Sequence, residues 1–341
     1  GMMMPIMQFV GNLGYVMVAL LGGVFVIKGS IEVGDIQSFF QYIRNFTQPI
    51  QQIAQVTNLL QSSAAASERV FEFLEEEEEV QQPEHPDSIE GLNGNVQFEH
   101  VEFGYNPDKI IVHDFSADVH DGQKIAIVGP TGAGKTTMVK LLMRFYDVNK
   151  GAIKVDGHDV RNFNRSELHE MFGMVLQDTW LFSGTIMENI RYGRLDATDE
   201  EVIAAAKAAH IHSFIMQQPG GYQMVLDEET SNISQGQKQL LTIARAILAD
   251  NKILILDEAT SSVDTRTEMQ IQKAMDNLMK GRTSFVIAHR LSTIKDADLI
   301  LVMKDGDIIE QGDHEELLAA KGFYADLYNS QFDNGSSELC S

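Results

Sequence analysis

The sequence predicts an α/β domain with a largely parallel sheet, preceded by an all-α membrane region. After residue 95, continuous apolar runs such as KIAIV, ILILDEA and SFVIAH alternate with longer helical patterns, which is typical of strands covered on both faces. In contrast, residues 1–27 contain no Lys, Arg, Asp or Glu. The two regions therefore differ in composition and in periodicity, which indicates separate parts of the molecule.

The composition limits the possible partners. The chain has 341 residues, 44% of them hydrophobic, and a formal net charge of −23. A balance this acidic argues against a nucleic-acid partner, because binding a phosphate backbone requires a basic surface. Cys340 is the single cysteine, so no internal disulfide can form and nothing requires an oxidising compartment. We expect the chemistry of the chain to face the cytosol.

Two apolar segments are predicted to span a membrane. Residues 5–27 are long enough to cross the roughly 30 Å hydrocarbon layer of a bilayer. Residues 36–60 have Arg44 as their single charge, and their polar residues, mostly glutamines, recur every three or four residues along one helix face. Alone, this second segment would fit a soluble amphipathic helix equally well. Beside a membrane span, its polar stripe becomes a candidate face of a substrate pathway, and Pro49 is expected to bend the helix.

The predicted domain organisation follows from these segments. Residues 1–74 form the C-terminal part of a transmembrane domain, and residues 75–94, which include a glutamate run and two prolines, form a linker. Residues 95–330 form the α/β domain. Within it, the mostly helical stretch at about 178–250 is expected to be an inserted subdomain. Residues 331–341 are expected to form a tail.

The motif G-x-x-x-x-G-K-[ST] occurs without a gap in GPTGAGKTT, between the apolar run KIAIV and a helical pattern. Its glycines let the backbone curl so that successive N–H groups face phosphate oxygens at a helix start. Lys135 would reach the β and γ phosphates, and the Thr136 hydroxyl would join a Mg²⁺ shell. A chance match is the alternative, and the flanking strand and helix argue against it. The predicted ATP-binding residues of this loop are Gly129, Pro130, Thr131, Gly132, Ala133, Gly134, Lys135, Thr136 and Thr137.

A second apolar run, ILILDEAT, supplies two acidic residues. Asp257 and Glu258 come at its end, where a carboxylate faces the ligand crevice of an open α/β sheet. Asp257 is a candidate Mg²⁺ ligand, and Glu258 is placed to polarise an attacking water in phosphoryl transfer. A simple turn at the end of a strand is the alternative, which the neighbouring phosphate motif makes less attractive.

The stretch SNISQGQKQLL raises a separate question. On its own it is a good helix start, with Ser234 capping backbone N–H groups that lack an intrahelical partner. The alternative is that the serine and the amides beside it bind an anion.

Six motifs in order resemble the nucleotide-binding domain of ATP-binding-cassette (ABC) transporters over about residues 96–327. They are the phosphate loop, Gln177 in VLQD, the signature-like ISQGQ, the acidic strand, Asp264 in SSVD and His289 in IAHR. The resemblance implies a P-loop NTPase cassette with an inserted helical subdomain. It also implies ATP and Mg²⁺ as cofactors.

The resemblance implies roles for three residues whose function could not be predicted from each residue alone. It implies that Tyr105 stacks on adenine, that Gln177 links the metal to the membrane part and that His289 holds the γ-phosphate. Alone, these residues would be read as a strand-end aromatic, a surface amide and a strand-end polar residue. The implied catalytic residues are Glu258, His289 and Gln177, the implied metal ligands are Thr136, Gln177 and Asp257, and Asp264 marks the D-loop.

In this family two cassettes close head to tail, so the resemblance implies that the signature acts in trans on a nucleotide held by the partner. Its residues here are Ser234, Gln235, Gly236 and Gln237. A helix start rich in N–H groups attracts an anion whichever subunit holds that anion. The commonest form of the signature has glycine where this chain has Gln235. The side chain of Gln235 must therefore point away from the phosphate.

The resemblance further implies a half-transporter of the exporter branch, of multidrug or lipid type, with the two spans as the last pair of six. We expect ATP-driven export by a multi-pass protein of a bacterial plasma membrane, with the nucleotide-binding domain in the cytosol. The expected partners are a second half-transporter, either a copy or a different chain, membrane lipid, and a small-molecule, lipid or peptide cargo. No nucleic acid is expected.

Two other functions fit the sequence less well. A soluble ABC-type ATPase clamp acting on nucleic acid or the ribosome would have no apolar span and would need a basic surface, and this chain has the opposite of both. A non-catalytic partner subunit would be favoured by altered residues at the hydrolytic positions, whereas Glu258 and His289 are both present.

Overall fold

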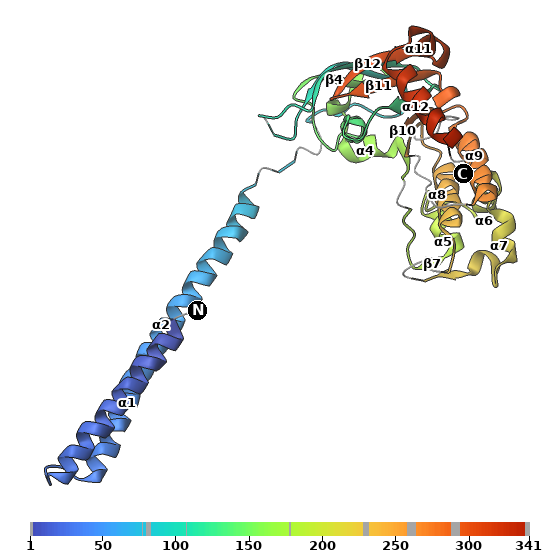
Figure 1. Ribbon diagram of the computed structural model, residues 1–341. Coiled ribbons are helices and arrows are strands. Elements are labelled where there is room, and N and C mark those ends of the chain that lie inside the picture. The colour runs from blue at the N-terminus through green and yellow to red at the C-terminus, as the bar shows by residue number, and fades with distance from the viewer. Residues whose placement is uncertain are drawn as a thin grey trace. The chain divides into compact units, whose positions relative to one another are not determined.

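A computed structural model describes residues 3–76, 78–79, 83–106, 108–176, 179–227, 232–257, 264–287 and 294–337. The chain divides into two compact units, Gly1–Glu79 and Val80–Ser341. The ribbon of both is drawn in Figure 1. The expected fold class, an α/β nucleotide-binding domain with a helical N-terminal region, is confirmed.

The first unit is a pair of helices, α1 (Met3–Ile27) and α2 (Val33–Glu75). They pack closely where α1 has a glycine: a Cβ atom on Gly22 would lie 2.9 Å from Cγ1 of Ile36. Farther along, the rings of Tyr15 and Phe40 are 5.3 Å apart between centroids. The small residue and the ring pair hold the two helices together.

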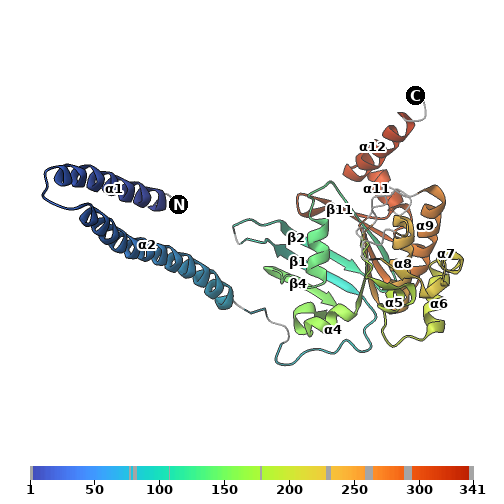
Figure 2. The same cartoon turned by 90° about the horizontal axis from the view of Figure 1, so that it is seen from below.

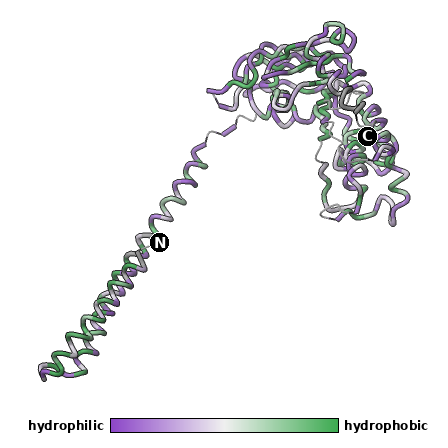
Figure 3. Tube along the Cα trace, viewed as in Figure 1, coloured by the Kyte–Doolittle hydropathy of each residue, from purple (hydrophilic) through white to green (hydrophobic). Residues whose placement is uncertain are grey.

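Most apolar side chains of the first unit face outward. Within α1, the segment Gln8–Ile27 is long and apolar enough to cross a membrane and only 6% of it is buried within the unit. Much of α1 is coloured as hydrophobic in Figure 3. Of the described helices, this is the one that meets the length and composition criterion, so a crossing at residues 36–60 stays a prediction. α2 contains that segment and continues as one helix through Pro49.

The second unit contains two larger sheets. The main sheet has the strand order β12-β11-β3-β10-β9-β6, in which β12 alone is antiparallel to its neighbour. The smaller, antiparallel sheet has the order β2-β1-β4-β5, and Figure 2 shows its first three strands side by side. A two-stranded ladder joins β7 and β8. The strands are β1 (Val96–Phe103), β2 (Val112–Val119), β3 (Lys124–Val128), β4 (Lys150–Val155), β5 (His158–Asp159), β6 (Phe172–Val175), β7 (Gly184–Thr185), β8 (Val225–Leu226), β9 (Ile253–Asp257), β10 (Thr283–Ile287), β11 (Leu299–Lys304) and β12 (Asp307–Gly312).

Helices flank the main sheet and connect its strands. The region between β6 and β9 is mostly helical, and its helix α8 carries a continuous buried face. The helices whose bounds lie within the described residues of this unit include α3 (Lys135–Leu142), α4 (Arg165–Glu170), α5 (Ile186–Arg191), α6 (Asp199–Ala208), α7 (His212–Gln217), α8 (Gln235–Ala249), α9 (Thr265–Met279), α11 (His314–Ala320) and α12 (Phe323–Ser337), with 3₁₀ turns at Val160–Asn162 and Gly221–Gln223.

Separate apolar cores cover the two faces of the main sheet. On one face, Phe98 and Phe115 of the small sheet pack in one core with Phe285 of the main sheet. The ring centroid of Phe98 lies 5.0 Å from that of Phe115 and 6.2 Å from that of Phe285. On the other face, α8 and α9 pack through residues such as Leu241 and Ile271. Burial on both faces explains why the parallel strands read as continuous apolar runs.

The last described helix, α12, crosses the boundary predicted between the α/β domain and the tail. The tail expected at residues 331–341 begins inside α12, which runs from Phe323 to Ser337. The apolar face of this helix ends early: Tyr324 is buried and its hydroxyl is 2.7 Å from Nδ1 of His314, whereas the last turns are polar. The polar last turns of α12 are nonetheless helical.

Candidate nucleotide-binding site

The predicted phosphate loop connects β3 to α3. Gly129, Gly132 and Gly134 have φ angles of +152°, +84° and +100°, a region in which side chains are strained. At Gly129 a Cβ atom would also lie 2.2 Å from the carbonyl oxygen of Met303. Gly134 is the N-cap of α3 and places no side chain over the helix start. The loop therefore presents bare backbone at a helix N-terminus, which suits a phosphate group.

The ammonium group of Lys135 is held by the loop. Its Nζ donates to the carbonyl oxygens of Gly129 and Pro130 at 2.7 Å and 3.0 Å. Burial lowers the pKa of Lys135, and the negative charge of Asp257 opposes part of that shift. Because the carboxylate acts on the ammonium, the two motifs predicted separately from the sequence meet at one site.

The acidic residue lies at the sheet edge that also carries the phosphate loop. β9 ends at Asp257, which pairs with Ile287 of β10, and Ile287 pairs in turn with Ile127 of β3. The carboxyl ends of these parallel strands therefore share one edge, where open α/β sheets bind ligands. Next to the lysine, Thr136 is exposed at the start of α3.

These residues fit Mg²⁺ bound together with a nucleotide. Among the residues that the structure describes, no cluster of three or more His, Cys, Asp or Glu could hold a metal by itself. Mg²⁺ is usually bound by one or two carboxylates, waters and substrate phosphates, so such a cluster is not required. Asp257 and Thr136 would supply the protein oxygens.

Tyr105 stands beside the helix that follows the phosphate loop. Its hydroxyl is 3.4 Å from Oγ1 of Thr137, and its ring packs edge-on against Tyr146 with centroids 5.0 Å apart. The ring is still 43% exposed, and Nζ of Lys140 is 6.0 Å from its centroid. An exposed aromatic face near the loop fits the predicted stacking on a base. The support from Tyr146 was not predicted, although the aromatic pair in RFYD is visible in the sequence.

The capping role predicted for Ser234 is confirmed. Ser234 is the N-cap of α8, its Oγ accepts from the backbone N–H of Gln237 at 3.3 Å, and Oε1 of Gln237 accepts from the N–H of Ser234 at 2.8 Å. The amide of Gln235 donates from Nε2 to Oγ1 of Thr179 at 3.1 Å. Gly236 is buried in the first turn.

The signature residues and the phosphate loop are not joined within the chain. In the described ranges, no hydrogen bond or ion pair links residues 234–237 with residues 129–137. The predicted action of the signature in trans remains a proposal that this separation allows.

Asp264 is the N-cap of α9. Its Oδ1 accepts from the backbone N–H groups of Arg266 and Thr267, each at 3.1 Å. Hydrogen bonds from Thr267, with that from its side chain the largest, hold the pKa of the Asp264 carboxyl below its usual value. The carboxylate of Asp264 therefore caps the start of α9 within this chain.

Three predicted site residues, Gln177, Glu258 and His289, lie outside the described residues. In the sequence they closely follow β6, β9 and β10, whose ends Val175, Asp257 and Ile287 are described. Those three strands are adjacent in the main sheet.

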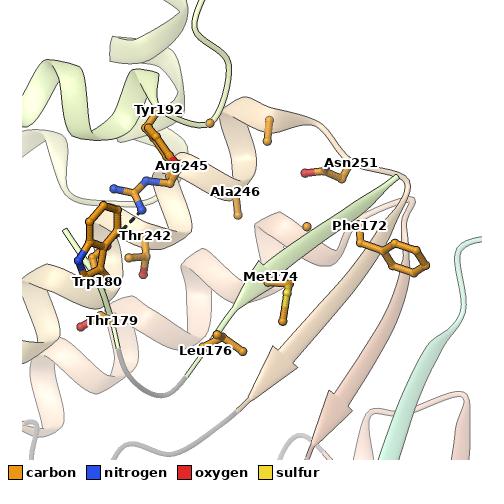
Figure 4. A pocket seen from close by; sticks show the side chains of 13 residues that line it. Phe172, Met174, Leu176, Thr179, Trp180, Tyr192, Thr242, Arg245, Ala246 and Asn251 are labelled. Carbon is orange, nitrogen blue, oxygen red and sulfur yellow. Dashed lines mark hydrogen bonds between the residues drawn. The ribbon is translucent and has the colours of Figure 1, made fainter. Parts of the chain in front are cut away.

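A groove of about 350 Å³ opens between β6, the segment that follows it and α8 (Figure 4). Arg245 of α8 extends toward that segment and was not predicted as a functional or structural residue. Its guanidinium donates to the carbonyl oxygens of Asn189 at 2.9 Å and Trp180 at 3.1 Å, the latter drawn as a dashed line. It also lies 5.1 Å from the ring centroid of Tyr192, and burial lowers the pKa of Arg245.

Replacing Arg245 should destabilise the α/β unit. We expect Arg245→Met to lower the free energy of unfolding by about 2–3 kcal/mol, because the carbonyl oxygens of Asn189 and Trp180 lose a charged donor and the first of them is partly buried. Urea unfolding measures the change. Lys207→Met, at an exposed cation on α6, is the matched control and should change it by no more than about 0.5 kcal/mol. Equal stability of the two variants would show that Arg245 does not hold the segment.

The loop glycines, Lys135, Asp257 and the sheet edge together define an α/β nucleotide-binding domain of the P-loop class. Residues 112–261 match the family model described as ABC transporter. The chain therefore contains an ABC transporter domain, and the family predicted from the six motifs is confirmed.

Relatives of known name agree. The chain is 54% identical over 324 residues to the fatty acid ABC transporter ATP-binding/permease protein of Mycobacterium tuberculosis (strain CDC 1551 / Oshkosh), covering 95% of this chain and 51% of the relative. It is 43% identical over 327 residues to the ATP-dependent lipid A-core flippase of Desulfotalea psychrophila, covering 96% and 57%. The chain thus spans about half the length of the curated relatives it matches.

A solved structure agrees as well. The structure of a bacterial Atm1-family ABC exporter with ATP bound matches with a TM-score of 0.71 and 37% sequence identity. The match covers 95% of this chain and 58% of that one.

Proposed function

We propose that this chain is part of a bacterial exporter in which ATP binding closes two nucleotide-binding domains and hydrolysis resets them. The observation that carries the proposal is the meeting of Lys135 with Asp257 beside the glycine loop, in a chain that also holds the apolar segment Gln8–Ile27. A phosphate site alone would fit many NTPases. The exposed apolar helix favours a membrane transporter over a soluble clamp.

Each residue of the site has one task in this proposal. The N–H groups of the loop and Lys135 bind the phosphates, and Asp257 and Thr136 bind Mg²⁺. Glu258 orients and polarises the attacking water, and His289 and Gln177 contact the γ-phosphate and the metal. When bound, ATP supplies the γ-phosphoryl group that is transferred to water.

We propose that the partner completes the site. Ser234, Gly236 and Gln237 of a second half-transporter, either a copy or a different chain, would face the γ-phosphate on this chain's loop. Moving a closure equilibrium from 1:99 to 99:1 requires about 5.5 kcal/mol of preferential binding, and two nucleotides held between two domains are a plausible source. The membrane helices would carry the closure to the cargo cavity.

For the cargo we propose a molecule with an acyl chain. The support is the printed names of two relatives, a fatty acid transporter and a lipid A-core flippase. Peptides and small molecules are the other cargo classes predicted from the sequence. The proposed location is a plasma membrane with the α/β unit in the cytosol, because that unit needs cytosolic ATP.

Transport by the complete assembly in liposomes tests the proposal. We expect ATP with Mg²⁺ to move a fluorescent fatty acid or phospholipid into the compartment opposite the nucleotide-binding domains, and a non-hydrolysable analogue to give no continuous transport. Membrane fractionation of cells expressing the full-length protein is the companion measurement. A protein found in the soluble fraction, with no ATP-dependent transport of any amphiphile, would contradict the exporter proposal.

A further inference from the structure

Gln235 occupies a signature position at which the commonest family form has glycine. It is the first residue of α8, directly after the capping Ser234. Its side chain is exposed, and its Nε2 donates to Oγ1 of Thr179 at 3.1 Å. Thr179 belongs to the segment after β6 and lines the groove in Figure 4. A residue of the signature is thus tied to a segment more than fifty positions away.

A glutamine side chain at this position that is not held by a hydrogen bond would weaken anion binding. The first N–H groups of a helix have no intrahelical partner, and a nearby side-chain oxygen can accept from them. The Oε1 atom of a free Gln235 could therefore compete with a phosphate for the N–H groups at the start of α8. Glycine at this position presents no such competitor.

The residue that holds Gln235 is itself fixed relative to α8. The next residue, Trp180, accepts a hydrogen bond on its carbonyl oxygen from Nη1 of Arg245 at 3.1 Å. Arg245 lies on α8, as does Gln235, and it also donates to Asn189 of α5. One arginine of α8 therefore holds both the residue next to Thr179 and helix α5, so Thr179 is a stable anchor for the amide.

We infer that Thr179 is a positioning residue that keeps the side chain of Gln235 off the anion-facing start of α8. The inference rests on the proposed function, because the anion in question is the nucleotide phosphate held by the partner. It assigns Thr179 no contact with substrate. The residue acts only through Gln235, so the effect of changing Thr179 should depend on which residue occupies position 235.

The test measures ATP hydrolysis by the complete assembly for four variants. Thr179→Val keeps the shape of threonine and removes Oγ1, and we expect it to raise KM for ATP about two- to fivefold with little change in kcat, as loss of one exposed hydrogen bond allows. Gln235→Gly supplies the reference KM for a chain without the glutamine side chain. The double variant Thr179→Val/Gln235→Gly should have the same KM as Gln235→Gly, because no glutamine side chain is left to position. Thr179→Ser retains a hydroxyl and should leave KM unchanged.

The double variant decides between positioning and structure. If Thr179→Val raises KM equally with Gln235 and with glycine at that position, Thr179 acts independently of Gln235 and the inference is wrong. An unchanged KM in Thr179→Val overturns it as well. Thermal unfolding checks that each variant is folded, and Thr179→Ala replaces the valine variant if that one is not.

The proposed function can fail separately. If Ser234→Arg, which places a bulky side chain at the start of α8, leaves hydrolysis unchanged, then the signature does not act on a nucleotide and the proposed function fails. If Ser234→Arg abolishes hydrolysis but the effect of Thr179→Val does not depend on Gln235, only the present inference fails.

Discussion

Lys135→Ala is expected to reduce ATP hydrolysis by about 100- to 1000-fold, the usual effect of removing one preorganised donor from a charged transition state. Lys135 lies on the loop itself, with its Nζ 2.7 Å from the carbonyl oxygen of Gly129. The negative charge of Asp257 also acts on this ammonium group and raises the pKa of Lys135 against the effect of burial. Removing it would leave the nucleotide phosphates and that carboxylate without their shared cation, so binding should weaken together with turnover.

Steady-state hydrolysis and equilibrium binding of a fluorescent ATP analogue measure the two effects of Lys135→Ala. Lys140→Ala is the matched control, because Lys140 is a second lysine of the same helix. Its Nζ lies 6.0 Å from the centroid of the Tyr105 ring. We expect its effect to be no more than a few-fold, through base stacking. A Lys135→Ala variant that kept hydrolysis within tenfold of the parent would show that this loop is not the phosphate site.

Glu258→Gln is expected to lower turnover by about 100-fold or more while ATP binding is kept, because the amide is neutral and no longer accepts a proton from the attacking water. In the sequence this residue directly follows Asp257, the end of β9. Rapid mixing followed by a filter assay would measure ATP trapped unhydrolysed on the complete assembly. Asp257→Asn is the comparison, and it should weaken Mg²⁺-dependent binding as well as turnover. Hydrolysis by Glu258→Gln at the parent rate would mean that the assigned base is wrong.

The parallel core of the fold was predictable because its strands are buried on both faces. The described parts of the runs KIAIV, ILILDEA and SFVIAH lie in β3, β9 and β10, side by side in the main sheet. The small antiparallel sheet was not among the predictions. Its strands are half exposed, and in β1 the alternation that marks such a strand is interrupted where Glu99 and His100 are both exposed.

The phosphate loop was predictable because its requirements are local. Glycines at fixed spacing allow the positive φ angles that the structure has, so the motif carries its own geometry. The contacts of Arg245 and Gln235 are different, because each depends on a segment more than fifty residues away that the fold brings near α8. Sequence spacing contains no signal for such contacts.

The central claim is that two chains together form each nucleotide site, and a cysteine cross-link tests it most directly. Thr131→Cys and Ser234→Cys would be placed in the full-length protein with Cys340→Ser, so that no other cysteine of this chain remains. A disulfide requires Cα atoms about 4.4–6.8 Å apart. Under mild oxidation we expect a covalent dimer to form in the presence of ATP, and we expect its yield to be lower without ATP. A cross-link formed within a single chain, or a dimer whose yield does not depend on ATP, would contradict the claim.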